Sequence, residues 1–289
     1  RLVGLGDVYK RQAKIFAFFG IGVGLLGIGT FTQVNGISSA VNNFFDSNNA
    51  WTVSLFGRTY SWTVVISCLI LTFCVALVLI GGIQRISKVA QVIVPFMAAT
   101  YFLAGILIIL FNITDVPAAI LTIVQSAFGL KAAAGGALGA MVVAMQKGIA
   151  RGIFSNEAGL GSAPIAAAAA RTNEPVRQGL VSMTATFIDT IIICSITGIA
   201  IVLTGAYDMG LEGVAVTTKA FQLGLPFPDG VASFILMLCL VFFAFTTILG
   251  WDYYSERCLE YLTNGKKKCI KAYRWISVSY THLRAHETE

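Results

Sequence analysis

The sequence RGIFSNEAGLGSAP, residues 151–164, interrupts a long apolar segment that runs from about residue 135 to 171. At a rise of about 1.5 Å per residue, a continuous helix of that length would be roughly 55 Å long, nearly twice the hydrocarbon thickness of a membrane. Glycines, a proline, an asparagine and a glutamate lie at its centre. We therefore predict two half-helices, one ending near Phe154 and the other beginning near Pro164, with a break at Ser155–Gly159.

The composition is that of a membrane protein. Hydrophobic residues make up 56% of the chain and charged residues 12%, whereas soluble domains carry about 25% charged residues. The net charge of +6 is concentrated in short segments between apolar runs, which is where the orientation of a membrane protein is set. We therefore expect the lipid bilayer as a partner and no nucleic acid.

Six membrane-spanning helices are predicted, which gives an all-α polytopic fold. Their approximate limits are 13–45, 62–80, 93–111, 135–171, 180–204 and 231–254. The first is so long that it must be tilted or broken. Pro95 would lie in the first turn of the third helix, where proline is tolerated.

Basic residues predominate on one side of six single crossings, and the other side carries acidic residues with only Arg58, Lys131 and Lys219 as bases. The segments after the second, fourth and sixth helices carry Arg85, Lys88, Arg171, Arg177 and a polar, basic tail. The remaining connections carry Asp46, Asp115, Asp208, Glu212 and Asp229. By the positive-inside rule the basic side is cytoplasmic, in a multi-pass protein of the plasma (inner) membrane.

The break at Ser155–Gly159 has a functional and a packing interpretation. Irregular backbone at membrane depth is tolerated only where it is buried in protein or lines a cavity, and secondary transporters bind ions and substrates at such breaks. The half-helix beginning near Pro164 would offer N–H groups to a carboxylate, and the half ending near Phe154 would offer carbonyls to a cation. A kink used only for packing would not need Asn156 and Glu157. Glu157 is either functional or bonded to exposed backbone N–H groups.

Asp189 lies deep in the fifth predicted helix, beside Thr190. A carboxylate at this depth is an ion ligand, a proton site, or a structural partner of Lys147 or Arg151. The sequence leaves these alternatives open.

Polar residues in the first and sixth helices are weaker candidates. Gln33 either contacts a substrate or bonds to a neighbouring helix. Thr246 and Thr247 are adjacent hydroxyls that suit a hard cation such as sodium, or that bond back to their own helix. Trp251 is either a lid over a pocket or an interfacial aromatic residue.

Several other patterns are rejected. The formal G-x-G-x-x-G at Gly22–Gly27 follows no strand, so we interpret it as close helix packing and not as a dinucleotide site. The six cysteines contain no C-x-x-C pair, and the only histidines are His282 and His286. We expect no disulfide framework, no histidine metal site and no covalent cofactor.

Residues 151–164 resemble the signature of the alanine or glycine:cation symporter family, the sodium/alanine symporters. Supporting matches are FGIGVGLLGIGTFTQVNGIS (19–38), VLIGGIQRISKVAQVIVPFMA (78–98), FIDT (187–190) and TTILGWDYYSERCLEYL (246–262). The resemblance covers about residues 13–275. It implies the five-plus-five inverted-repeat fold of the leucine transporter, with core helices three to eight present as one incomplete domain over residues 13–276.

The resemblance also implies a function, which is sodium-coupled uptake of alanine or glycine by alternating access. Substrate contacts would come from Gln33, from Phe154, Ser155, Asn156 and Gly159 at the break, and from Trp251 as a closing residue. Thr246 and Thr247 would hold a second sodium ion, and Asp189 lies on the helix that contributes to the first. We expect a transporter and not an enzyme.

The two ends of the chain, residues 1–12 and 277–289, resemble translated sequencing-adapter read-through and are treated as non-native tails. Core helices one and two would precede residue 13, and nine and ten would follow residue 276. Because the missing first core helix would supply much of the sodium and carboxylate contacts, we do not expect the fragment to transport alone.

Three alternative functions are considered. Proton coupling would use Asp189 or Glu157. An intramembrane aspartyl enzyme needs two carboxylates at one site, and Asp189 has no second aspartate at its depth. A channel would need a continuous pore and would not accumulate substrate. The sequence does not indicate chirality, ion stoichiometry or oligomeric state.

Overall fold

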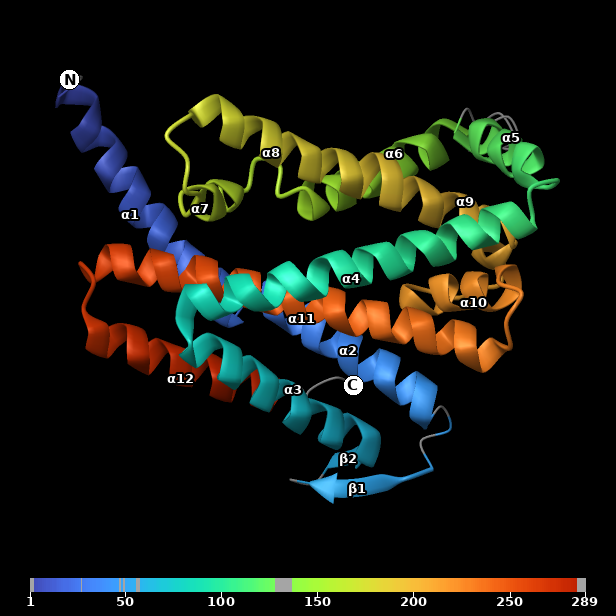
Figure 1. Cartoon of the computed structure of the whole chain (residues 1–289), viewed down its shortest axis with the longest axis horizontal. Helices are drawn as coiled ribbons and strands as arrows, with labels where there is room; N and C mark the ends of the chain where they lie inside the picture. The colour runs from blue at the N-terminus through green and yellow to red at the C-terminus, as the bar shows by residue number, and fades with distance from the viewer. Residues whose placement is uncertain are drawn as a thin grey trace. The chain divides into compact units, whose positions relative to one another are not determined.

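The computed structural model describes residues 3–26, 28–46, 48, 50–55, 58–127 and 137–284. The described residues form helices and one two-stranded hairpin (Figure 1). They separate into two compact units, which we call unit 1 (Arg1–Ala99 and Phe234–Glu289) and unit 2 (Thr100–Ser233).

Unit 1 contains the first helices, the hairpin and the last helices. Its elements are α1 (Val3–Leu26), α2 (Ile28–Phe45), β1 (Thr52–Leu55), β2 (Arg58–Ser61), α3 (Trp62–Ile80), the first part of α4 (Gly82–Phe111), most of α11 (Asp229–Leu262) and α12 (Lys267–Arg284). The strands are antiparallel, with Thr52 opposite Ser61 and Leu55 opposite Arg58.

Unit 2 contains the remainder of α4 and the middle of the chain. Its further elements are α5 (Val116–Ala127), α6 (Ala137–Ser155), α7 (Ala163–Ala167), α8 (Pro175–Phe187), the π-helix η1 (Ile188–Cys194), α9 (Ser195–Leu203), the 3₁₀ turn η2 (Ala206–Asp208) and α10 (Val214–Gly224).

Four helical segments of the described residues are long and apolar enough to cross a membrane. They are α3, α4, the continuous run Pro175–Leu203, and α11. They match four of the six predicted spans. The prediction over 13–45 corresponds to α1 and α2, on either side of Gly27, which lies outside the described residues. The prediction over 135–171 corresponds to α6 and α7. The count of six crossings and the inverted repeat stay predictions.

The predicted starts of the first, third and fifth helices are wrong, since α1 begins at Val3 and α8 at Pro175. The third predicted helix begins at Gly82 and not near residue 93, because the single residue Gly81 separates α3 from α4 and Gly82, at φ +68°, turns the chain at once into a new helix. Arg85 and Lys88 therefore lie in a helix and not in a loop. Pro95 lies inside α4 and not in its first turn, which membrane helices tolerate by local readjustment.

The other limits changed because polar sequence continues as helix. The last predicted helix extends from 254 to Leu262, where Glu256 and Arg257 form an ion pair along it at 2.6 Å. The expected polar tail then forms α12. Arg177, expected in a loop, lies in α8. The hairpin and the short helices α5 and α10 were not predicted.

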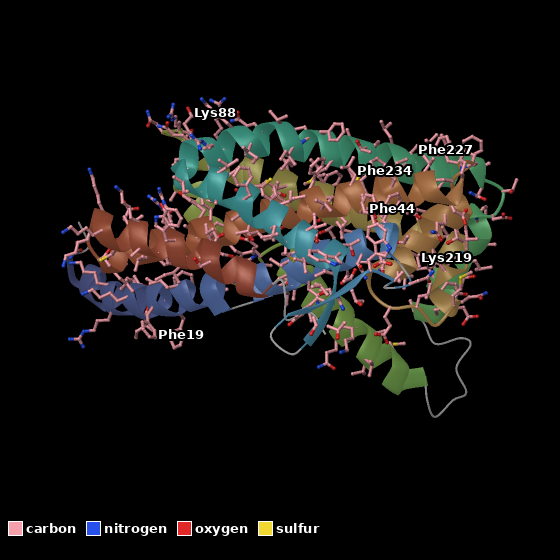
Figure 2. The ribbon with its side chains drawn as sticks, turned by 90° about the horizontal axis from the view of Figure 1, so that it is seen from below. Phe19, Phe44, Lys88, Lys219, Phe227 and Phe234 are labelled. Atoms are coloured by element: carbon pink, nitrogen blue, oxygen red, sulfur yellow. The ribbon has the colours of Figure 1, made fainter. Side chains whose placement is uncertain are left out.

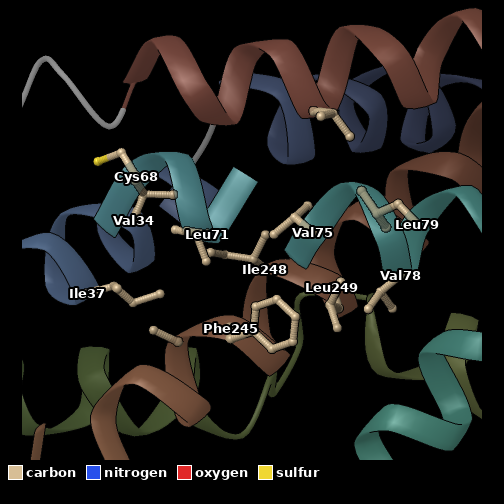
Figure 3. Packing of buried hydrophobic residues seen from close by; sticks show 12 residues of the cluster. Val34, Ile37, Cys68, Leu71, Val75, Val78, Leu79, Phe245, Ile248 and Leu249 are labelled. Atoms are coloured by element: carbon tan, nitrogen blue, oxygen red, sulfur yellow. The ribbon is translucent and has the colours of Figure 1, made fainter. Parts of the chain in front are cut away.

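The core of unit 1 joins α2, α3 and α11 (Figure 3). Its fully buried members include Val34, Cys68, Val75, Ile248 and Leu249. At the end of α2, the ring of Phe44 lies 5.7 Å between centroids from that of Phe234 on α11 (Figure 2). Because lipid tails are as apolar as these side chains, close packing holds such a cluster together in a membrane.

Glycines allow α1 to approach α11 closely. A Cβ atom on Gly24 would lie 1.9 Å from Ser255 Oγ, and one on Gly20 would lie 2.7 Å from Cys258 Sγ. Ser255 Oγ donates a hydrogen bond to the Gly20 carbonyl at 2.8 Å. The packing interpretation of the glycine row is confirmed at Gly24. A Cβ on Gly22 would meet no described heavy atom within 4 Å, and Gly27 is outside the described residues.

Candidate functional site

The predicted break in the fourth helix is confirmed, and its local geometry explains why α6 ends. The N–H of Ala158 donates to the Ile153 carbonyl at 3.0 Å, and the N–H of Glu157 donates to the Phe154 carbonyl at 3.3 Å. Glu157 has φ +52°. This is a Schellman ending in which glutamate occupies the left-handed position that glycine usually takes.

The left-handed conformation of Glu157 costs about 1–2 kcal/mol for a residue with a Cβ. Its carboxylate is held by Ser162, whose buried hydroxyl donates to Glu157 Oε2 at 2.8 Å. Glu157 therefore ties the end of α6 to the start of α7. The contact to Ser162 is one that the sequence did not reveal.

Beyond Glu157 the chain stays irregular up to Pro164. Gly159 and Gly161 have φ of +76° and +78°, and a Cβ on Gly159 would meet no described heavy atom within 4 Å. The backbone at Gly159 is therefore open to a ligand. Pro164 lies in the first turn of α7, as predicted, but α7 has only five residues, so its dipole is small.

The end of α6 is bonded to η1 by two consecutive residues on each side. Ser155 Oγ donates to Asp189 Oδ2 at 2.5 Å. Asn156 Nδ2 donates to Thr190 Oγ1 at 2.8 Å, and Thr190 Oγ1 donates to Asn156 Oδ1 at 3.2 Å. We call Ser155, Asn156, Asp189 and Thr190 the break cluster. The segment η1 continues α8 directly in the chain.

The η1 segment interrupts the run Pro175–Leu203 with a π-helix over Ile188–Cys194. π-helical turns inside α-helices are rare and are frequently found at functional sites. Asp189 and Thr190 lie in its first turn, so both helices that meet at the break cluster are irregular at the point of contact. The sequence placed Asp189 and Thr190 deep in the span but held no signal for the π-helix.

The predicted structural partners of Asp189 are not those observed. Among the described residues, no ion pair joins Asp189 to Lys147 or Arg151, and its hydrogen bond comes from Ser155. Asp189 is half-buried. A half-buried carboxylate that receives a hydroxyl and faces a helix C-terminus is suited to a cation.

The other predicted site residues lie in unit 1, on α2 and α11. Thr246 Oγ1 donates to the Phe242 carbonyl at 2.9 Å, and Thr247 Oγ1 donates to the Phe243 carbonyl at 2.8 Å. Both hydroxyls bond back to their own helix, and their oxygen lone pairs can still accept a cation. Gln33 is half-buried on α2. Trp251 is half-buried and packs edge-on against Tyr254 at 5.6 Å between centroids.

Each unit therefore holds its own part of the predicted site. Unit 2 brings together Ser155, Asn156, Asp189 and Thr190, with Phe154 and Gly159 adjoining in sequence. Among the described residues there is no cluster of three or more His, Cys, Asp or Glu side chains that could hold a metal. A sodium site here would draw on hydroxyl, amide and backbone oxygens as well as Asp189.

Comparison with known proteins identifies the family of the chain. A model of the Sodium:alanine symporter family matches residues 4–288. The chain belongs to this family. The resemblance found in the sequence is confirmed, and with the four apolar helices it establishes an integral membrane protein. The match extends into both end segments, 4–12 and 277–288, whose non-native origin stays a prediction.

Relatives in the sodium:alanine symporter family are similar over most of the chain. An "Uncharacterized transporter" of Haemophilus influenzae is 51% identical over 284 residues, 98% of this chain and 58% of the relative. "Sodium/alanine symporter AgcS" of Methanococcus maripaludis is 42% identical over 275 residues, 94% of this chain and 54% of the relative. "Sodium/proton-dependent alanine carrier protein" of Bacillus sp. PS3 is 37% identical over 202 residues, 65% and 44% of the two chains. The chain spans about half the length of these curated relatives.

Proposed function

We propose that the full-length protein couples sodium to the uptake of a small neutral amino acid, alanine or glycine, by alternating access. The observation that carries this proposal is the break cluster, in which the end of a broken helix is bonded to a π-helix through Ser155–Asp189 and Asn156–Thr190. Membership of the sodium:alanine symporter family supports it.

The break cluster would bind the first sodium ion. The C-terminus of α6 concentrates negative dipole and free carbonyls near Ser155. Asp189 adds carboxyl oxygens, of which Oδ2 lies 2.5 Å from Ser155 Oγ, and Asn156 and Thr190 add amide and hydroxyl oxygens. Hard cations prefer such oxygen donors. Sodium binding would then tighten the contact between α6 and η1, because the ion would be shared by the two helices.

The substrate would lie next to this ion. The open backbone at Gly159 allows close approach because glycine has no Cβ, and Phe154, which is 38% exposed, would contact the short apolar side chain. Following the family resemblance, Gln33 would contact the substrate, Trp251 would close over it, and Thr246 and Thr247 would hold a second sodium ion. The basic ends of the helices would face the cytoplasm.

Uptake into proteoliposomes tests the proposal. The full-length protein is reconstituted, and labelled alanine and glycine are added with an inward sodium gradient or with choline in place of sodium. We expect accumulation above the outside concentration only with the sodium gradient, and its loss when the gradient is dissipated. Accumulation that does not depend on the gradient would contradict sodium coupling. Equilibration without accumulation would indicate a channel.

Proton coupling is the second candidate. It is favoured by two carboxyl groups, Glu157 and Asp189, at the break, and by a relative named as sodium/proton-dependent. An inward proton gradient without sodium distinguishes the two. Accumulation driven by that gradient alone would replace sodium coupling with proton coupling.

A further inference from the structure

Unit 1 contains a large apolar cavity that is separate from the break cluster. Its volume is about 890 Å³, and side chains of α2, α3, α4 and α11 line it. Ile37, Leu71 and Phe245, labelled in Figure 3 as members of the buried core, also line this cavity. Ligand cavities in proteins are typically about 300–1,000 Å³ in volume, so the cavity is large enough for a sizeable ligand.

The cavity follows α3 from Thr63 at one end to Cys74 at the other. At a rise of about 1.5 Å per residue, this separation of eleven residues corresponds to roughly 16 Å. Half of the hydrocarbon core of a bilayer is about 15 Å thick. Since α3 is long and apolar enough to cross a membrane, the length of the cavity along α3 matches the depth of one lipid leaflet.

Two tryptophans place the Thr63 end of the cavity at the membrane surface. Trp51 precedes the hairpin and is 73% exposed, and Trp62 begins α3 and is 45% exposed. Exposed tryptophans gather at the level of the lipid head groups. The cavity therefore begins at that level and descends into the hydrocarbon.

One charged side chain, Asp46, lines this end of the cavity. Its Oδ1 accepts the Ala50 N–H at 2.8 Å, and its Oδ2 accepts the Trp51 N–H at 3.2 Å and the Ser61 hydroxyl at 3.0 Å. The hydrogen bond from Ala50, the largest cause, lowers the pKa of Asp46, so the group stays ionised near neutral pH. A carboxylate has about four acceptor positions, which leaves capacity for a further donor.

We propose that this cavity binds one acyl chain of a phospholipid whose head group carries a primary ammonium, with the ammonium on Asp46 and the chain along α3. Phosphatidylethanolamine is the simplest such lipid. The apolar walls, the depth of one leaflet and the single carboxylate at the head-group level fit its chemistry. Phosphatidylcholine offers the same chains but no N–H donor, and quaternary ammonium groups are instead recognised by aromatic cages.

Native mass spectrometry of the full-length protein in mild detergent tests the proposal. The protein is titrated with dioleoyl phosphatidylethanolamine or with dioleoyl phosphatidylcholine. We expect one tightly bound phosphatidylethanolamine, preferred about fivefold over phosphatidylcholine, since an exposed ion pair with Asp46 gives only a modest preference. Equal retention of the two lipids would overturn the assignment of the head group.

Two variants with matched controls locate the lipid. Asp46→Asn keeps an acceptor for the Ala50 N–H but removes the charge, so we expect the preference to disappear, whereas Asp115→Asn in an exposed loop should keep it. Ser67→Trp fills the cavity and removes bonds within its own helix, to the Val64 carbonyl and to Cys68, so retention of both lipids should fall. Leu69 lies on the same helix and is 52% exposed, so the Leu69→Trp variant should retain both lipids.

Three outcomes would overturn the proposal. An unchanged preference in Asp46→Asn would exclude the carboxylate as the ammonium ligand. Unchanged retention in Ser67→Trp would show that the chain lies elsewhere or that protein fills the cavity. Equal losses in Leu69→Trp and Ser67→Trp would show that the effect is not specific to the cavity. The thermal transition of each variant confirms that it is folded.

Discussion

The two pairs of adjacent polar residues predicted for the site, one pair in each unit, are hydrogen-bonded in different ways. In unit 1, Thr246 and Thr247 donate to carbonyls of the helix that carries them. In unit 2, Ser155 and Asn156 bond to another helix, where both backbones are irregular. Within the regular helix α11 the threonine hydroxyls donate to carbonyls of the preceding turn, whereas at the broken end of α6 the polar side chains bond to the neighbouring segment η1. The chain thus contains both regularly packed helices in unit 1, which we call the frame, and irregular backbone at the break in unit 2.

The largest effect is expected where the frame is tightest. In Gly24→Leu the new side chain would overlap Ser255, because even a Cβ would lie 1.9 Å from Ser255 Oγ. Overpacking costs about 1–3 kcal/mol or more, so the yield of monodisperse protein in size-exclusion chromatography should collapse. Gly22→Leu, two residues away and with open space at its Cβ, should behave like wild type. A stable Gly24→Leu protein would contradict the close approach of α1 and α11.

The next effect is expected at the charged contact of the break cluster. Ser155→Ala removes a hydroxyl that bonds to Asp189, and hydrogen bonds to charged groups contribute about 1.5–3 kcal/mol. We expect the sodium concentration for half-maximal alanine uptake to rise about tenfold. The matched change in the frame, Ser67→Ala, removes only bonds within one helix and should leave sodium activation unaltered.

The neutral contact of the same cluster should matter less. Asn156→Ala and Thr190→Val each remove the Asn156–Thr190 pair, which contributes about 0.5–1.5 kcal/mol. Each should slow uptake about threefold to tenfold, and the double variant should be no slower than the worse single variant, because the two residues share one interaction. Strictly additive losses would show that Asn156 and Thr190 act separately.

A smaller effect is expected from backbone strain at Glu157. Glu157→Gly and Glu157→Ala both remove the carboxylate that Ser162 contacts, but only glycine also relieves the φ of +52°. We expect the glycine variant to be about 1 kcal/mol more stable than the alanine variant, measured as a difference in thermal unfolding. An alanine variant of equal stability would argue against the left-handed conformation.

The smallest effect concerns pH and the hairpin. The pKa of Asp46 is lowered in the folded state, chiefly by the Ala50 N–H. Its stabilisation of the hairpin is therefore present above the unfolded pKa, about 3.9, and is lost as pH falls through the lower folded value. Trp51 fluorescence, taken as the difference from Trp51→Phe, should change in this acid range. The change should be absent in Asp46→Asn, and its persistence there would implicate another group.

The break was predictable from sequence because the apolar segment is both too long for one membrane-spanning helix and too polar at its centre. A helix that is too long for the membrane and carries Asn156, Glu157 and Gly159 at its centre has to be interrupted near those residues. The predicted limits at Phe154 and Pro164 were correct to within a residue or two, and the family followed from the same residues. The start of α4 was not predictable. Charged residues such as Arg85 and Lys88 between two apolar runs are typical of a loop, although neither residue type breaks a helix.

Pairing across the cluster could not be predicted for a different reason. The sequence placed Asp189 at membrane depth, and basic residues such as Arg151 are the default partners of a buried carboxylate. The hydroxyl of Ser155 is the partner of Asp189 instead, because Ser155 ends α6 and Asp189 lies in the π-helix, and these two irregular segments meet. Such local backbone irregularities carry no periodic signal, so contacts that depend on them emerge only in three dimensions.

The claim that the break cluster binds sodium is tested most directly by equilibrium binding of radioactive sodium to the purified full-length protein. We predict saturable sodium binding that Asp189→Asn weakens at least about tenfold, because loss of a charge-assisted contact of about 1.4 kcal/mol corresponds to that factor. Asp208 is an exposed carboxylate of the same unit, and Asp208→Asn should leave sodium binding unchanged. Sodium binding by Asp189→Asn with wild-type affinity and stoichiometry would contradict the assignment of this site.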